Sequence, residues 1–230
     1  MQNEDVRALF DGLRVTDVRD GMDWVGLHTK GSISGDIGPL FQGAKAVGIA
    51  RTIRLRPSQK VVPPGITPDE YTGWAYDYWY GEVVSMRMTE TLQGGDFIVI
   101  ESAGLDVGEV GSNNSLEWYA SGAVGVLTSG GVRDRDECVL QGVPIFGKFR
   151  AQKMLQGRVE LDSTDVPVNI GGVLVRPGDV IVADGDGAIC VPIEHAEDVA
   201  KYARQESEND KAGRRRLYEK LGWPLDDTVR

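Results

Sequence analysis

The sequence is poor in the residues on which several common kinds of active site depend. Its 230 residues include two histidines, His28 and His195, and two cysteines, Cys138 and Cys190. The cysteines match no zinc or redox spacing, and two isolated histidines argue against a multi-histidine metal site or a histidine-based triad. Any acid–base or metal chemistry must therefore rest mainly on carboxylates, arginine and backbone groups.

Basic residues and long apolar runs are also scarce. Lysine and arginine total 25 against 35 acidic residues, a formal charge of −10, which argues against nucleic acid as the main partner. No apolar run reaches the roughly 18 residues that span a bilayer, and the charged start MQNEDVRALF has no signal-peptide core. Together with the sparse cysteines, these absences lead us to expect a soluble cytoplasmic protein without a membrane or nucleic-acid partner.

Glycine is abundant, with 30 residues, which is typical of many short strands joined by tight turns. We expect one domain over residues 1–230, with an N-terminal helical segment over about residues 1–30 and a C-terminal helix over about residues 194–220. Between them the pattern predicts strands at 46–55 and 97–100. Further predictions are helices at 82–92 and 112–121 and a mostly β segment at 158–192. This order predicts a layered α/β domain.

The segment 57–81 departs from this regular order. It contains four prolines, followed by six aromatic residues between Tyr71 and Tyr80. We expect an irregular excursion here. Either it packs against the body or another subunit, or it covers a substrate as a lid.

The first candidate binding element is the start of the helix near Ser112. A helix start presents unpaired backbone N–H groups and the positive end of the helix dipole, and both favour a carboxylate or phosphate. The residues here are small and polar (SNNS), so little would block a ligand. Serine and asparagine also cap helices that bind nothing, and that alternative stays open.

The second candidate is the turn SGGVRD, which follows the apolar run AVGVL. Gly130 and Gly131 are expected to let the chain turn tightly at the end of a buried strand, where ligands gather in open α/β sheets. Arg133 offers a planar fork for a carboxylate or enolate oxygen, and Asp134 a hard oxygen ligand for Mg²⁺ or Mn²⁺. The alternative is a surface arginine beside an aspartate that complements a helix dipole.

Three segments together give the chain a family resemblance. They are GAVGVLTSGGVRD, the downstream VPIFGKF, and PGDVIVADGDGAICVP. They resemble the RraA-like proteins, a family that contains the regulators of ribonuclease activity A and the divalent-metal-dependent 4-hydroxy-4-methyl-2-oxoglutarate and 4-carboxy-4-hydroxy-2-oxoadipate aldolases. The resemblance implies a swivelling β/β/α sandwich of the phosphohistidine-domain type, assembled as a homotrimer or homohexamer with active sites at subunit interfaces.

The resemblance also assigns roles to residues of this chain. It implies that Asp134 holds Mg²⁺ or Mn²⁺ and that Arg133 contacts a pyruvyl group and stabilises its enolate. It implies that Glu208, on the C-terminal helix of a neighbouring subunit, joins the site. The helix start that would bind the substrate carboxylate comprises Gly111, Ser112, Asn113 and Asn114.

One position departs from the aldolase pattern. The aldolases have an acidic residue separated by twenty residues from the Arg-Asp pair, and counting back from Arg133 reaches Ser112. A neutral hydroxyl cannot replace a charged ligand or base. Glu109 or Asp106, just upstream, could supply the missing charge.

We therefore expect a metal-dependent lyase that acts on a small 2-oxo or hydroxy acid by retro-aldol cleavage or decarboxylation through a stabilised enolate. Two alternatives stay open. The chain could be a non-catalytic regulator that binds an RNA-processing enzyme, or a metal-dependent dehydratase or isomerase of a hydroxy or sugar acid.

Overall fold

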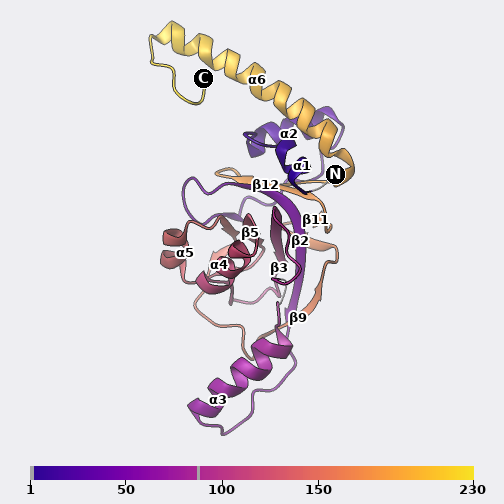
Figure 1. Cartoon of the computed structure of the whole chain (residues 1–230), viewed down its shortest axis with the longest axis vertical. Coiled ribbons are helices and arrows are strands. Elements are labelled where there is room, and N and C mark those ends of the chain that lie inside the picture. The colour runs from indigo at the N-terminus through magenta and orange to yellow at the C-terminus, as the bar shows by residue number, and fades with distance from the viewer. Residues whose placement is uncertain (1–2, 87–88) are drawn as a thin grey trace.

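The computed structural model describes residues 3–86 and 89–230, which form a mixed α/β fold (Figure 1). Its helices are α1 (Asn3–Leu9), α2 (Val15–Trp24), α3 (Pro68–Trp74), the π-helix η1 (Ala75–Val83), α4 (Ser112–Ala120), α5 (Arg135–Gln141), the short 3₁₀ helix η2 (Ile193–His195) and α6 (Ala196–Leu221). Its strands are β1 (Gly38–Pro39), β2 (Ala46–Pro57), β3 (Asp96–Glu101), β4 (Gly108–Val110), β5 (Gly125–Thr128), β6 (Gly131–Val132), β7 (Ile145–Gly147), β8 (Phe149–Arg150), β9 (Val159–Thr164), β10 (Val168–Ile170), β11 (Val173–Val175), β12 (Val180–Asp184) and β13 (Gly187–Val191).

The main sheet has eight strands in the order β1-β7-β5-β3-β2-β12-β13, with β9 also paired to β2. The long strand β2 pairs with β3 in parallel and with β12 and β9 in antiparallel fashion. The chain leading into β1 reaches the opposite edge of the sheet, where the Ile33 amide donates to the Ala188 carbonyl at 3.2 Å and the Cys190 amide to the Gly31 carbonyl at 2.9 Å. The sheet therefore curls into a nearly closed barrel.

Strand β3 shows why the sheet is buried on both faces. Ile98 and Ile100 pack into one hydrophobic cluster, while Phe97 and Val99 pack into another. All four are buried, as expected for a parallel strand covered on both sides. Successive side chains on a strand point to opposite faces, so one apolar run fills two cores.

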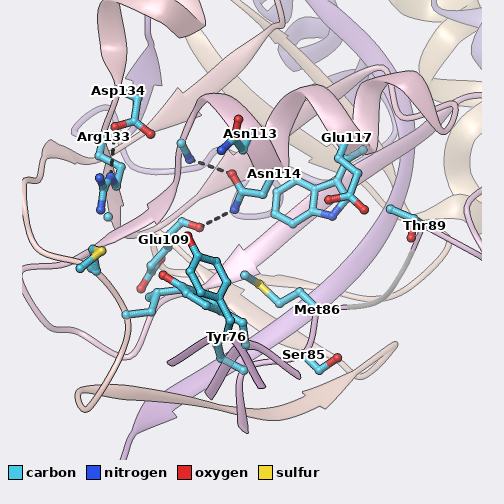
Figure 2. Close-up of a pocket in the computed structure, with 17 residues that line it drawn as sticks. Tyr76, Ser85, Met86, Thr89, Glu109, Asn113, Asn114, Glu117, Arg133 and Asp134 are labelled. Carbon is cyan, nitrogen blue, oxygen red and sulfur yellow. Dashed lines mark hydrogen bonds and ion pairs between the residues drawn. The ribbon is translucent and has the colours of Figure 1, made fainter. Parts of the chain in front are cut away.

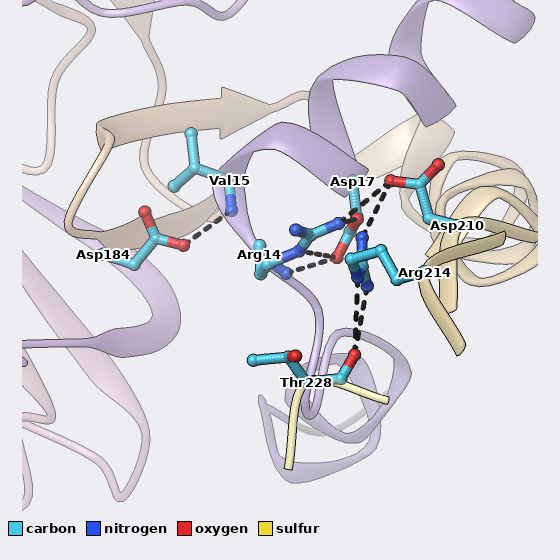
Figure 3. Close-up of polar contacts among 7 residues, drawn as sticks. All are labelled: Arg14, Val15, Asp17, Asp184, Asp210, Arg214 and Thr228. Atoms are coloured by element: carbon cyan, nitrogen blue, oxygen red, sulfur yellow. Dashed lines mark hydrogen bonds and ion pairs between the residues drawn. The ribbon is translucent and has the colours of Figure 1, made fainter. Parts of the chain in front are cut away.

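A layer made by α1, α2 and α6 covers the face of β12 and β13. Helices α2 and α6 approach closely because Gly21 has no side chain; a Cβ there would lie 2.5 Å from the Val199 carbonyl oxygen. In Figure 3, Arg14 bonds to Asp17 at 3.0 Å and reaches Asp210 on α6 at 3.5 Å. Beyond these contacts, α6 extends past the body of the molecule (Figure 1).

A second, three-stranded sheet lies apart from the main one. Its strands run in parallel in the order β4-β6-β8. Helix α4 begins one residue after β4 ends, and Arg133 follows directly after β6. Since the carboxyl ends of neighbouring parallel strands share one edge of a sheet, this small sheet brings the two candidate turns together.

The predicted strands at 46–55 and 97–100 and the helix at 112–121 are confirmed to within a few residues, as is the C-terminal helix. The N-terminal helical segment consists of α1 and α2, with residues 1–2 outside the described part. The predicted helix at 82–92 is wrong where it can be compared, because 84–86 and 89–92 form bends and turns; residues 87–88 lie outside the described part.

The prediction of an irregular excursion at 57–81 is confirmed for residues 58–67 and wrong for the rest, because residues 68–83 are helical. The reason is a capping box: the Thr67 hydroxyl accepts from the Glu70 amide, the Glu70 carboxylate accepts from the Thr67 amide, and Pro68 occupies the first helical turn. Among the described residues, no helix is long and apolar enough to cross a membrane.

Candidate functional site

A pocket of about 450 Å³ opens at the carboxyl ends of β4 and β6 (Figure 2). One side of it is polar and is formed by the loop after β6 and the start of α4. The other side is formed by η1 and the chain that follows it. Its residues include Tyr76, Tyr80, Val84, Ser85, Met86, Thr89, Gly108, Glu109, Gly111, Asn113, Asn114, Glu117, Trp118, Arg133, Asp134, Met154 and Leu155.

Arg133 and Asp134 lie side by side in this pocket. The Arg133 Nε donates to the Asp134 carboxylate at 3.1 Å, and both side chains are about one third exposed. Asp134 adopts a left-handed backbone conformation, with φ at 51°, which is uncommon outside glycine, asparagine and aspartate. This conformation turns the chain from β6 into α5 and leaves the carboxylate facing the start of α4.

The start of α4 is partly occupied by the protein's own groups. The Gly111 amide donates to the Asn114 side chain at 2.8 Å, and the Ser112 amide donates to Asp134 at 3.3 Å. Among the hydrogen bonds of the described residues, none engages the backbone N–H of Asn113 or Asn114. These two amides are therefore the part of the helix start that a ligand carboxylate could use.

Three glycines allow close packing around the site, although not in the way that the sequence predicted. Neither Gly130 nor Gly131 adopts a left-handed turn conformation, and Gly131 belongs to β6. A Cβ on Gly130 would lie 2.2 Å from the Glu109 carboxylate, and a Cβ on Gly111 would lie 2.6 Å from the Asp134 carboxylate. Close approach, rather than turning, is the reason for glycine at these positions.

Glu109 also contributes a carboxyl group to the pocket that contains Arg133 and Asp134. Its side chain is almost fully buried, at 1% exposed, and accepts hydrogen bonds from the Ser102 hydroxyl at 2.5 Å and the Thr128 hydroxyl at 2.7 Å. Burial raises the pKa of Glu109, although the two hydroxyls oppose the shift. By contrast, Asp106 is exposed and pairs with Lys153 at 2.6 Å, so of the two upstream acids only Glu109 reaches the pocket.

The raised pKa gives stability a defined pH dependence. The folded chain holds the Glu109 proton more tightly than the unfolded chain does, so protonation of Glu109 stabilises the fold. This stabilisation is complete below the ordinary glutamate pKa of 4.5 and is lost as the pH rises through the raised pKa. Glu109→Gln cannot ionise. We expect its free energy of unfolding, relative to wild type, to increase as the pH is raised from about 4 to about 8 in urea titrations.

Glu117→Gln is the matched control, since it removes a pocket carboxylate from an exposed position. A Glu109→Gln profile that runs parallel to the wild-type profile over this pH range would contradict the expectation.

The aromatic segment supplies the wall that the sequence could not place. Tyr76 and Tyr80 of η1 line the pocket together with Met86 and Met154. The dense run of aromatic residues in the sequence indicated that this segment could cover a substrate. It did not show which of the six faced the pocket. Glu117, one turn along α4 from Asn113, was missed because an acidic residue on a helix surface carries no distinguishing signal.

Glu208 is exposed on α6 and is not among the pocket residues. Figure 1 shows α6 at the end of the molecule opposite α3, away from α4 and α5. One chain therefore does not bring Glu208 to Arg133. Its participation through a neighbouring subunit stays a prediction.

The donor set suits a hard divalent cation held by few protein ligands. The described residues contain no group of three or more His, Cys, Asp and Glu side chains that could hold a metal ion. Asp134 nevertheless offers carboxylate oxygens at the open pocket, which is the kind of ligand that Mg²⁺ and Mn²⁺ prefer. Magnesium usually combines one or two carboxylates with water and substrate oxygens, so Asp134 and this pocket fit such an ion.

Comparisons with known proteins identify the family of this chain. The sequence profile of the RraA-like family, described as Aldolase/RraA, matches residues 15–190. A Halalkalibacterium halodurans protein, named provisionally as a 4-hydroxy-4-methyl-2-oxoglutarate aldolase, is 26% identical over 90% of this chain and 86% of its own. A Thermus thermophilus 4-hydroxy-4-methyl-2-oxoglutarate aldolase is 30% identical over 46% of this chain and 65% of its own.

Among solved structures, Streptomyces coelicolor RraAS2 is described as an unusual member of the RNase ES inhibitor RraA family. It superposes with a TM-score of 0.77 at 24% identity, over 94% of this chain and all of that one. At that identity the likeness shows the fold alone. The profile match spans well over half of the chain, from the start of α2 to β13, and contains both turns of the pocket. The chain therefore belongs to the RraA-like family.

Proposed function

We propose that this protein is a divalent-metal-dependent lyase that cleaves a 2-oxo acid, by retro-aldol cleavage or decarboxylation, through an enolate. The observation that carries the proposal is the convergence of Arg133, Asp134 and the free amides of α4 in one pocket. The aldolase names of relatives on the same family profile support it.

Each group has a role that follows from its chemistry. The amides of Asn113 and Asn114 and the positive end of α4 would bind the substrate carboxylate. Arg133 would donate to the oxygen on which negative charge develops when the carbon–carbon bond breaks. Asp134 would hold Mg²⁺ or Mn²⁺, which when bound supplies further positive charge to that oxygen. Asp134 also fixes the Arg133 side chain through the 3.1 Å bond.

In retro-aldol cleavage the substrate hydroxyl loses a proton as the carbon–carbon bond breaks, and the enolate carbon then gains one, so a single acid–base group can serve both transfers. In decarboxylation the enolate carbon gains a proton in place of the released CO₂. Glu109 is buried against Gly130 and has a raised pKa, so it can hold a proton nearer to neutral pH than an exposed carboxylate can. The Ser102 and Thr128 hydroxyls orient its carboxyl group. Glu109 would thus supply the acid–base function that the aldolase pattern places at the position of Ser112.

The test is whether the protein releases pyruvate from a panel of 4-hydroxy-2-oxo acids and oxaloacetate. A coupled assay measures the pyruvate. We expect turnover in Mg²⁺ or Mn²⁺, loss of at least about a hundredfold in EDTA, and recovery when the metal is returned. Chelation should leave the circular dichroism spectrum unchanged, because the pocket holds itself together through protein hydrogen bonds. Absence of product from every substrate with either metal would refute the proposal.

Two observations keep other functions open to test. Ser112 lacks the aldolase carboxylate, and a structural neighbour is described as a member of an RNase inhibitor family. If the protein is a regulator, it should form a stable complex with an RNase E-type enzyme in size-exclusion chromatography, and Arg133→Ala should leave that complex intact. If it is a dehydratase or isomerase, NMR of the same substrate panel should show a changed acid without release of pyruvate.

A further inference from the structure

Helix η1 is an unusual wall for a small polar site. All nine of its residues, Ala75–Val83, form a π-helix, a rare element that is found mostly as short bulges at functional sites. Trp79 fixes the helix to the body: its side chain is 0% exposed, and its indole N–H donates to the Val159 carbonyl of β9 at 3.2 Å. The segment is therefore held in place against the sheet.

This anchored helix directs two tyrosines towards the catalytic pair. Tyr76 and Tyr80 are four residues apart, their ring centroids are 6.1 Å apart, and both line the pocket. Burial raises the pKa of Tyr80, and the positive charge of Arg133 opposes that shift. Tyr76 is 68% exposed, so its ring is accessible to a ligand in the pocket. In Figure 2, Tyr76 lies below Glu109 and Asn114, while Arg133 and Asp134 lie at the upper left.

Other residues add apolar surface to the pocket. Val84, Met86, Met154 and Leu155 line it together with the tyrosines, and Ser85 and Thr89 contribute hydroxyl groups. Methionines and tyrosines make adaptable contacts with flat and aliphatic groups. Among the described residues of the pocket, Arg133 is the only one with a positive side chain. Glu117 adds negative charge, which would oppose a second carboxylate on the substrate.

The volume indicates the size of the ligand. At about 450 Å³, the pocket falls within the range of sites that enclose drug-sized molecules, which is far more space than a three-carbon acid needs. The polar side accounts for one carboxylate and the adjacent oxygen. Space next to Tyr76 and Tyr80 remains.

We propose that Tyr76 and Tyr80 form a specificity subsite for an aryl or bulky aliphatic group, so that the substrate is a 2-oxo acid with one carboxylate and an apolar group at its far end. This inference rests on the proposed function for the head group only. The aromatic subsite selects against oxo-dicarboxylic acids, which would place a second charge against the apolar wall and beside Glu117.

Binding tests the subsite separately from catalysis. Phenylpyruvate and 2-oxoglutarate share the 2-oxo acid head and differ in carrying a ring or a carboxylate. In calorimetric titrations with Mg²⁺, wild-type protein should bind phenylpyruvate at least about tenfold more tightly than 2-oxoglutarate. Equal affinity, or preference for 2-oxoglutarate, would overturn the subsite. Binding of phenylpyruvate without pyruvate release from any substrate would overturn only the proposed lyase function.

Variants assign the effect to the tyrosines. Tyr76→Ala with Tyr80→Ala should weaken phenylpyruvate about tenfold or more and change pyruvate binding by less than about threefold. Phenylalanine at both positions should retain the phenylpyruvate affinity. Tyr119→Ala is the matched control, because Tyr119 is exposed on α4 and lies outside this pocket. Equal losses for pyruvate and phenylpyruvate would show a structural role and contradict the subsite.

Discussion

Replacing Asp134 by asparagine should lower the rate of pyruvate release by about a thousandfold. Asparagine is the informative substitution because it tolerates the left-handed backbone that Asp134 adopts and can still accept from the Ser112 amide. The fold at this turn is therefore retained, while the negative charge is lost. In the proposed mechanism that charge holds a divalent ion and orients Arg133, so kcat should fall much more than stability does.

Asp136→Asn is the matched control. Asp136 lies two residues further on, in the exposed first turn of α5. Its substitution removes the same charge from the same helix start without changing the pocket. We expect its activity to stay within about twofold of wild type. Kinetics of both variants, with unfolding midpoints measured alongside, separate the two positions. Comparable activity of Asp134→Asn and wild type would remove Asp134 from the catalytic site.

The sequence was sufficient to locate the two turns of the pocket because each turn depends on local chemistry. Arg133 and Asp134 follow a short run of glycines, and the small residues after Gly111 mark an open helix start. Each turn is visible over a few residues. Their meeting was an inference from family and topology, and the structure places both at the carboxyl ends of the adjacent strands β4 and β6.

The apolar half could not be predicted in the same way. The capping signal of Thr67 and Glu70 was present, but prolines and aromatic residues around it favoured irregular structure. Which aromatic side chains are buried depends on contacts with β9, about eighty residues further along the chain. Glu109 presents a similar problem. Its buried carboxylate is held by hydroxyls on β5 and before β4, and an isolated glutamate in the sequence gives no sign of these partners.

Trp79→Ala should have the largest effect on stability, a loss of about 3–5 kcal/mol in the free energy of unfolding. The indole is fully buried in the cluster that joins η1 to β2 and β9, and its N–H is paired with Val159. Truncation leaves a large cavity and an unpaired carbonyl. Urea unfolding followed by circular dichroism measures the loss without depending on tryptophan fluorescence.

Trp24→Ala provides the control, since Trp24 ends α2 with 66% of its surface exposed, and it should change the unfolding free energy by less than about 0.5 kcal/mol. Changes at Trp79 should also affect ligand binding. Because Trp79 fixes the helix that carries Tyr76 and Tyr80, a folded Trp79→Phe protein should weaken phenylpyruvate binding more than pyruvate binding. Identical unfolding midpoints for Trp79→Ala and Trp24→Ala would show that η1 is not anchored through this indole.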